Sequence, residues 1–174
     1  MADTLAIEIA ASLAWLFQDA LDLATVSETA RLEYSATLED GVNASQADKL
    51  WHDQRTLAAG ANDDLDLSAL SRSLFGGSLS VSMAKVKCVL VQNLASASGE
   101  DLLVGGAGAA NDAWAEPWNV DLDAAARIHA GGALLLAHPQ TGWSVADGTS
   151  DVLRVHNEGA SAVTYNIAIV GCSA

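Results

Sequence analysis

Four histidines are the residues in this chain most suited to binding a metal ion. No two of them stand in a His-x-His or His-x-x-x-His spacing, the four being His52, His129, His138 and His156. A cupin-type metal centre needs such a pair on neighbouring strands beside a carboxylate. The isolated positions indicate polar surface or loop residues, and we therefore expect no metal centre.

Three carboxylates, those of Asp63, Asp64 and Asp66, are clustered directly after Asn62. Oxygen-rich loops bind calcium, but a full site takes roughly six to eight oxygen ligands and usually a glycine turn. The spacing of an EF-hand loop is missing here. A solvated turn leading into a helix is the favoured interpretation, and a calcium site at these aspartates is the open alternative.

Two further motifs point away from catalysis. The glycine-rich segment 105–110 (GGAGAA) lacks the Gly-Lys-Ser/Thr ending of a phosphate-binding loop, and no Gly-x-Ser-x-Gly nucleophile elbow occurs. Scattered serines, histidines and aspartates have no spacing that supports a triad. We expect a protein that is not an enzyme, with no catalytic residue and no cofactor.

The tryptophans are candidates for binding rather than for catalysis. Trp114 and Trp118 flank a short loop-like stretch, and Trp143 follows a glycine. An exposed tryptophan can stack on a sugar or anchor a protein interface, whereas a buried one covers the end of a core. Covering the core is the favoured interpretation, and Trp114 and Trp118 remain candidate partner contacts.

Composition bounds the remaining possibilities. The 174 residues are 51% hydrophobic and 17% charged with a net charge of −14, which fits one globular domain over residues 1–174 and disfavours nucleic acid as a partner. The apolar stretch 5–17 is too short for a membrane span, and no secretory signal is evident, so we expect a soluble protein made in the cytoplasm. Cys88 and Cys172 are expected to be buried thiols rather than a disulfide.

The N-terminal segment has an ambiguous pattern. Leu5, Ile7 and Ile9 alternate as in a strand, whereas a set of larger residues follows helical spacing, namely Leu13, Leu16, Phe17 and Leu21. A strand followed by a short helix or an irregular second strand is expected. Residues 1–25 could form an extended arm or subunit-contact segment, with Leu13, Leu16 and Phe17 as candidate partner contacts.

The elements up to residue 81 are of mixed type. Residues 31–38 (RLEYSATL) alternate apolar and polar side chains, which predicts a half-buried antiparallel strand. Residues 47–60 fit a strand or a helix. Residues 65–75 predict a short helix that Ser68 caps and Gly76-Gly77 ends, with one apolar face formed by Leu67, Leu70 and Leu74.

From residue 78 onward the pattern is that of strands. The alternation changes phase near Ala84, which indicates a β-bulge or a strand break. Residues 102–104 predict a strand, 127–138 a strand, a Gly-Gly turn and a strand, and 152–157 with 162–170 a terminal hairpin. Turn signals recur about every ten residues, so we predict a mainly β antiparallel β-sandwich with one or two short helices.

The order of these segments resembles small β-sandwich structural proteins in the virions of tailed bacteriophages. The resemblance covers most of residues 47–174, with Ala130 standing where a proline is expected before Gly131-Gly132. The segments that carry it are 86–93 (VKCVLVQN), 102–106 (LLVGG), 128–136 (IHAGGALLL), 142–145 (GWSV), 153–157 (LRVHN) and 165–171 (YNIAIVG), with 47–51 (ADKLW) and 65–67 (LDL) upstream.

This resemblance implies a virion protein with no catalytic residues. The expectation is a jelly-roll-like capsid decoration (cement) protein that forms a homo-oligomer, a trimer, and contacts the major capsid protein or other virion proteins. Neither nucleic acid nor a membrane is an expected partner. Two alternatives are a tail component (tube, terminator or fibre-associated protein) and a carbohydrate-binding module that uses the tryptophans.

Overall fold

The computed structural model describes residues 4–20, 23–74 and 77–174, and these are mainly β, as predicted. Two single-turn 3₁₀ helices, η1 (Ala109–Asn111) and η2 (Glu116–Trp118), are the helical segments in this part of the chain. The strands are β1 (Ile7–Ala20), β2 (Thr25–Asp40), β3 (Gln46–Ala47), β4 (Lys49–Leu57), β5 (Asn62–Asp66), β6 (Leu70–Leu74), β7 (Gly77–Val81), β8 (Lys85–Asn93), β9 (Leu102–Gly106), β10 (Ala125–Ile128), β11 (Ala133–Ala137), β12 (Trp143–Ser144), β13 (Val152–Asn157) and β14 (Val163–Cys172).

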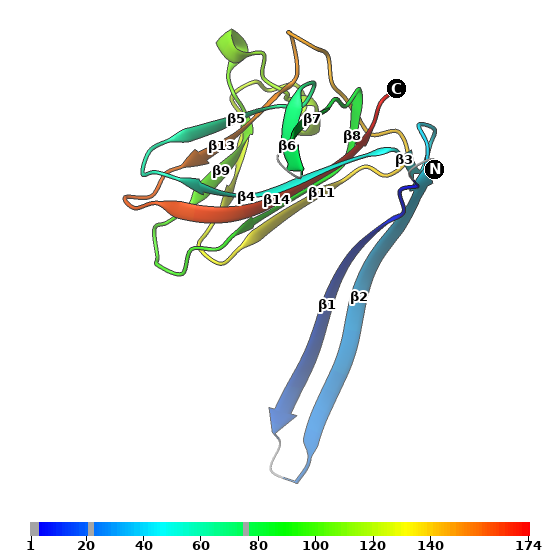
Figure 1. The fold of residues 1–174 in the computed structure, drawn as a ribbon. Helices are drawn as coiled ribbons and strands as arrows, with labels where there is room; N and C mark the ends of the chain where they lie inside the picture. Colours follow the sequence, from blue (N-terminus) through cyan, green and yellow to red (C-terminus); the bar gives the residue numbers. More distant parts are fainter. Residues whose placement is uncertain (1–3, 21–22, 75–76) are drawn as a thin grey trace.

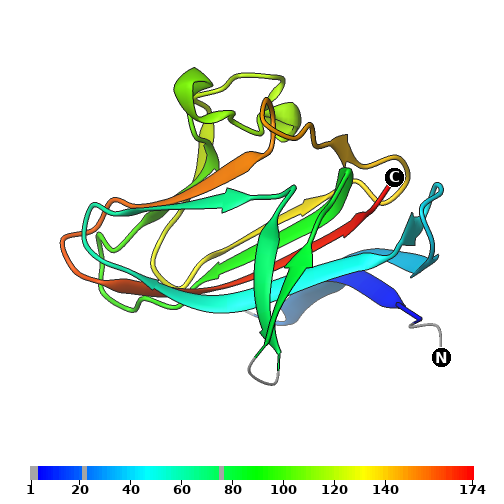
Figure 2. The ribbon, with the colours of Figure 1, turned by 45° about the horizontal axis from the view of Figure 1, so that its top comes forward.

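The body of the molecule is a sandwich of two antiparallel sheets packed face to face (Figures 1 and 2). One sheet has the strand order β11-β8-β14-β4, with the short β12 beside β8, and is called the arm sheet below. The other has the order β10-β9-β13-β5 and is called the far sheet. The predicted antiparallel β-sandwich is thus confirmed.

The chain passes repeatedly from one sheet to the other. Eight strands make up the two strand orders just given. The first of them in sequence (β4) pairs with the last (β14), and the second (β5) pairs with the seventh (β13). The third and sixth, β8 and β11, pair in the arm sheet, and the fourth and fifth, β9 and β10, pair in the far sheet. Most pairings therefore join segments that are distant in sequence.

The core lies between the two sheets because alternate residues of each strand point inward. In β13, Leu153 and Val155 are fully buried, and in β14, Tyr165 and Ile169 are fully buried. Burying one such side chain contributes roughly 1.5–3 kcal/mol. The β6–β7 hairpin covers an open edge of the sandwich, where the carbonyl of Ser71 accepts a 2.8 Å hydrogen bond from the indole of Trp51.

A long hairpin formed by β1 and β2 projects from this body (Figure 1). The two strands pair without interruption from Ile7 with Leu38 to Ala20 with Thr25. The base of the hairpin is fixed to the body because β2 runs parallel to β3 and because Ile9 and Leu38 are buried against the arm sheet. Beyond its base the hairpin packs against no described residue of the sandwich. The whole hairpin, β1 together with β2, is called the arm below.

The arm corrects two expectations for the N-terminal region. The helical spacing from Leu13 onward was misleading, since β1 continues as a strand to Ala20; Leu21 lies outside the described residues. Residues 31–38 do form an antiparallel strand, but it is not half-buried. Only Ala36 and Leu38, at the base, are covered, because no other element packs against the rest of β2.

The helix predicted for residues 65–75 is wrong. Leu65 belongs to β5 and is opposite Leu153, and Leu70 belongs to β6 and is opposite Val81. Leu70, one of the three leucines that suggested a helical face, is therefore buried as part of a strand. Phe75 and Gly76 of the predicted helix lie outside the described residues. The ambiguous segment 47–60 is resolved as a strand, β4.

Three further predictions concern how strands are joined. The change of phase near Ala84 is a break between β7 and β8, whereas a bulge lies in β8, where Gly171 pairs with Val86 and Val170 with Cys88. The terminal hairpin is wrong in its pairing, because β13 and β14 lie in different sheets. The strands on either side of Gly131-Gly132 likewise form as predicted but lie in different sheets.

Candidate interaction surface

One face of the arm is apolar and the other is polar. Residues directly opposite in an antiparallel pair project from the same face, so the register of β1 with β2 sorts the side chains into two sets. The large apolar side chains of one set beyond the base, called the apolar arm face below, are Leu13, Trp15, Phe17, Val26, Leu32 and Tyr34. Two carboxylates share this face, Glu28 opposite Phe17 and Asp19 opposite Val26. The opposite face carries Ser12, Thr29, Arg31 and Glu33, and Arg31 Nε donates to Ser12 Oγ over 2.9 Å.

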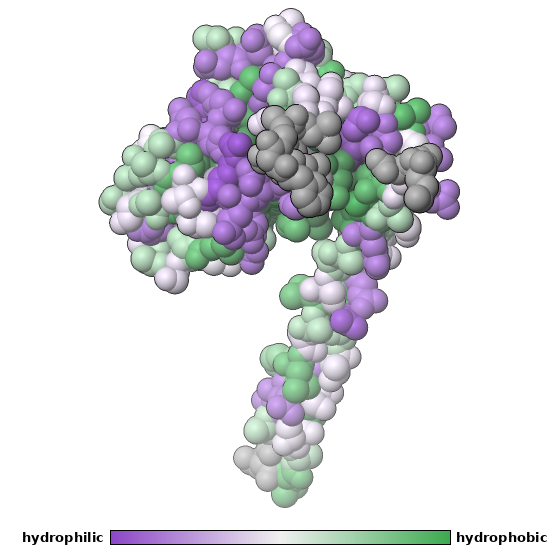
Figure 3. Space-filling model, in the orientation of Figure 1, coloured by the Kyte–Doolittle hydropathy of each residue, from purple (hydrophilic) through white to green (hydrophobic). Residues whose placement is uncertain are grey.

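The apolar arm face is open to solvent along its length. Leu13 and Leu32, which are opposite each other, are 63% and 66% exposed. Figure 3 shows hydrophobic atoms along the edge of the arm that faces the space beneath the body. A two-stranded hairpin standing alone in water is marginally stable, so the stripe of large apolar side chains on this hairpin is a candidate interaction surface.

The candidate contact residues of the N-terminal region do not share one face. Leu13 and Phe17 belong to the apolar arm face, but Leu16 pairs with Thr29 and projects from the opposite, polar face. Helical spacing brings these three residues together, whereas a strand alternates them. Trp15, Val26, Leu32 and Tyr34 were not identified from the sequence as members of the site, although the alternation of residues 31–38 already placed Leu32 and Tyr34 on one side of a strand.

A groove lies where the base of the arm meets the outer face of the arm sheet. It measures about 270 Å³, and we call it the elbow groove. Residues 7–10 of the arm, which include the carboxylate of Glu8, line one side, and the residues that line the other side are Leu50, Cys88, Leu90, Leu135, Ala168 and Val170. Sequence reasoning did not identify this groove, because its walls come from five separate strands.

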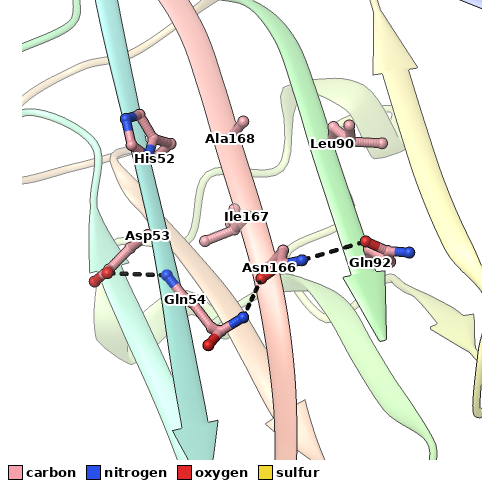
Figure 4. Close-up of a pocket in the computed structure, with 8 residues that line it drawn as sticks. All are labelled: His52, Asp53, Gln54, Leu90, Gln92, Asn166, Ile167 and Ala168. Carbon is pink, nitrogen blue, oxygen red and sulfur yellow. Dashed lines mark hydrogen bonds between the residues drawn. The ribbon is translucent and has the colours of Figure 1, made fainter. Parts of the chain in front are cut away.

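The elbow groove continues into a second, more polar hollow on the same sheet face, with Leu90 and Ala168 lining both. Figure 4 shows three amides that cross neighbouring strands at this end. The Gln54 amide donates to Asn166 Oδ1 over 2.8 Å, and the Asn166 amide donates to Gln92 Oε1 over 3.3 Å. The outer face of the arm sheet is therefore apolar beside the arm and polar farther away.

The tryptophan candidates lie at another part of the molecule. Trp114 is completely buried, and its indole donates a 2.8 Å hydrogen bond to the carbonyl of Ser144. Its ring stands edge-on to those of Trp118 and Trp143, each with a centroid separation of 6.1 Å. Trp118 and Trp143 are partly buried against the core, so this cluster chiefly covers the end of the sandwich.

The three candidate calcium ligands do not converge. Alternation along β5 directs Asp63 inward beside Leu65, whereas Asp64 and Asp66 are exposed. Each carboxylate has its own partners: Asp63 binds Arg55 and Tyr165, Asp64 binds Arg154 over 2.6 and 2.8 Å, and Asp66 accepts from Ser68. Within the described part of the chain, no three His, Cys, Asp or Glu residues are grouped so that they could hold a metal ion.

The histidines are likewise distributed over separate sites. His129 Nδ1 lies 2.9 Å from Asp101, His138 lies 3.1 Å from the Thr141 hydroxyl, and His156 lies 2.6 Å from Asn62. His52 stands at the hollow of Figure 4. No pair of histidines is brought to a shared site by these contacts.

Two buried groups have shifted pKa values that follow from their surroundings. Burial raises the pKa of the Cys88 thiol to about 11, and both Cys88 and Cys172 are free and buried, as predicted. Burial, together with the hydrogen bond to Asp63, raises the pKa of the Tyr165 hydroxyl. Neither group is accessible enough to act as a nucleophile at neutral pH.

Comparison of the chain with protein-family models, with curated proteins and with solved structures finds no match. Within the described residues, no helix has the length and apolar character needed to cross a bilayer. The apolar arm face and the elbow groove are thus the surface features on which a functional interpretation has to rest.

Proposed function

We propose that this chain is a non-enzymatic structural protein of a tailed-bacteriophage virion, and specifically a capsid decoration (cement) protein. The observation that carries the proposal is the apolar arm face, in which Leu13 and Leu32 are about two-thirds exposed on a projecting hairpin. A protein that joins subunits needs such a contact element, whereas an enzyme has no evident use for it.

The strand order supports the same proposal. Pairing of the first body strand with the last, the second with the seventh, the third with the sixth and the fourth with the fifth is the order of a jelly roll, a fold used by many viral shell proteins. We interpret the sandwich as jelly-roll-like on this basis. The resemblance of residues 47–174 to phage β-sandwich proteins points in the same direction.

The charge of the chain also suits a protein present in many copies on a particle. A net charge of −14 repels packaged nucleic acid and keeps finished particles apart. Association of such chains needs apolar contacts that outweigh this repulsion. The six large side chains of the apolar arm face offer such contacts beside the carboxylates of Asp19 and Glu28, and a homotrimer around a symmetry axis is the assembly we propose.

Mass spectrometry of phage particles from the source strain, purified by density gradient, tests this function. We expect the chain to sediment with the particles in many copies, and labelling with an antibody is expected to decorate the capsid. Labelling of the tail would instead support the alternative of a tube, terminator or fibre-associated protein. A chain that is present in the cells but missing from the particles would overturn the proposal. The carbohydrate-binding alternative has less support, since Trp114 is buried.

A further inference from the structure

We propose that the elbow groove receives the arm of a second copy of this chain, so that copies associate in a head-to-tail ring. This inference rests on the proposed function and extends it by naming the partner of the arm. The occupant of the elbow groove is the apolar arm face of the neighbouring copy, and the surface that receives it is formed by Leu90, Leu135 and Ala168 on the outside of the arm sheet.

The first argument is that the same kind of contact already exists within one molecule. Ile7 and Ile9 lie on the same face of β1 as Leu13, and at the base of the arm they pack with Cys88 and Val170 of the arm sheet. The elbow groove continues this contact surface outward to Leu90, which is 43% exposed. A second arm would repeat against Leu90 and Leu135 the packing that the first arm makes beside them.

The second argument is geometric. The arm leaves the body and points away from it, so its apolar face cannot fold back onto the groove of its own molecule (Figures 1 and 3). The arm and the arm sheet enclose an open angle with apolar side chains on both walls. A neighbouring arm is a ribbon of two strands about 10 Å wide. It presents large side chains to a groove whose lining includes two small residues, Ala168 and Cys88.

The third argument concerns area. Six large side chains that are about half exposed offer on the order of 500 Å² on the apolar arm face. A contact that covered this face with an equal area of a partner would bury about 1,000 Å² in total, which is the lower limit for specific association, so the arm must also contact the sheet surface beside the groove. Because the contact joins two different surfaces, each copy in a closed ring makes it twice, once with its arm and once with its groove.

Charge-introducing substitutions on the two surfaces test the inference. Leu32→Glu, or Leu13→Glu as a second variant, changes the apolar arm face, and Leu90→Glu changes the groove. The matched controls are Thr29→Glu on the polar face of the arm and Thr56→Glu at the far end of the same sheet face. All five positions are exposed, and thermal unfolding of the body verifies that each variant is folded.

Sedimentation velocity and native mass spectrometry of the purified full chain give the readout. We expect wild type and both controls to be oligomers, and each changed surface to weaken association at least about tenfold. Mixing the Leu32→Glu and Leu90→Glu chains should restore one contact, between the intact arm of one and the intact groove of the other, and yield a 1:1 pair.

Three results would overturn the inference: a wild-type monomer, a Leu90→Glu variant that associates like wild type, or a mixture that stays monomeric. In the second case the arms contact one another rather than the groove. These outcomes are independent of the particle experiment, because a chain can exchange arms in solution and still be missing from virions.

Discussion

Ile9 and Leu13 project from the same face of β1, yet Ile9 is 5% exposed and Leu13 is 63% exposed. The apolar pattern is the same at both positions, and only the neighbouring surface differs. Ile9 lies over the arm sheet, while Leu13 lies beyond it. The boundary between a buried and an open apolar stripe therefore falls within a single strand, and it marks where the body ends and the proposed partner contact begins.

The proposed contact between the apolar arm face of one copy and the elbow groove of another predicts how salt affects association. Copies that carry a net charge of −14 repel one another, and added salt screens that repulsion without weakening an apolar contact. We expect the association constant to rise roughly threefold to tenfold between low and physiological ionic strength. Sedimentation equilibrium across a salt series measures this change. A fall with rising salt would mean that ion pairs dominate the interface.

A second prediction concerns Tyr165, whose buried hydroxyl donates to Asp63 while Arg55 pairs with the same carboxylate. Since the folded state holds Tyr165 neutral and raises its pKa, its contribution to stability is complete below about pH 10 and is lost as the pH rises further. We expect Tyr165→Phe to lower the free energy of unfolding by about 1–2 kcal/mol near pH 7.

Urea unfolding from pH 7 to pH 11 tests this expectation. The wild-type free energy of unfolding should decline above about pH 10, by up to about 1.4 kcal/mol per pH unit from this group. The Tyr165→Phe variant should decline less steeply. Parallel pH profiles for the two proteins would show that Tyr165 ionises as easily in the folded state as in the unfolded chain.

A third prediction concerns Lys87, the residue at the bulge of β8, which is 1% exposed and donates from Nζ to the carbonyl of Gln140. Burial lowers the pKa of its ammonium group. Lys87→Ala removes a buried stem and leaves the carbonyl without this donor, so we expect a loss of about 2–4 kcal/mol.

Chemical denaturation of three variants separates the contributions of Lys87. Lys87→Met keeps the volume of the stem and removes the buried charge, so its loss should be about 1 kcal/mol or less. Lys85→Ala, two residues away and less buried, serves as the control. Equal losses in Lys85→Ala and Lys87→Ala would contradict a special role for the buried lysine.

The alternation of single strands could be predicted from the sequence, but their partners could not. Residues 31–38 form a strand with Leu32 and Tyr34 on one face, as their alternation indicates. Whether that face is buried depends on a surface outside the segment. Similarly, 152–157 and 163–170 are strands, yet β13 pairs with β5 and β9 rather than with β14, because the chain crosses from one sheet to the other between β13 and β14.

The candidate site was predictable only in part for the same reason. Leu13 and Phe17 were found because large apolar residues near a chain end are conspicuous, while Leu16 was grouped with them on a helical period that a strand does not have. The groove residues Leu90, Leu135 and Ala168 gave no local signal. Their strands look like ordinary core strands, and only the assembled sheet reveals that these side chains point outward.

The pairing of β4 with β14 has a consequence for synthesis on the ribosome. β14 lies between β4 and β8 and follows every other strand of the sandwich in sequence, so the arm sheet cannot be completed until β14 has been synthesised. The arm precedes the body strands in sequence, and its base is buried only once Cys88 of β8 and Val170 of β14 are in place. A chain that stops before β14 therefore carries the arm but lacks an inner strand of the sheet that holds it.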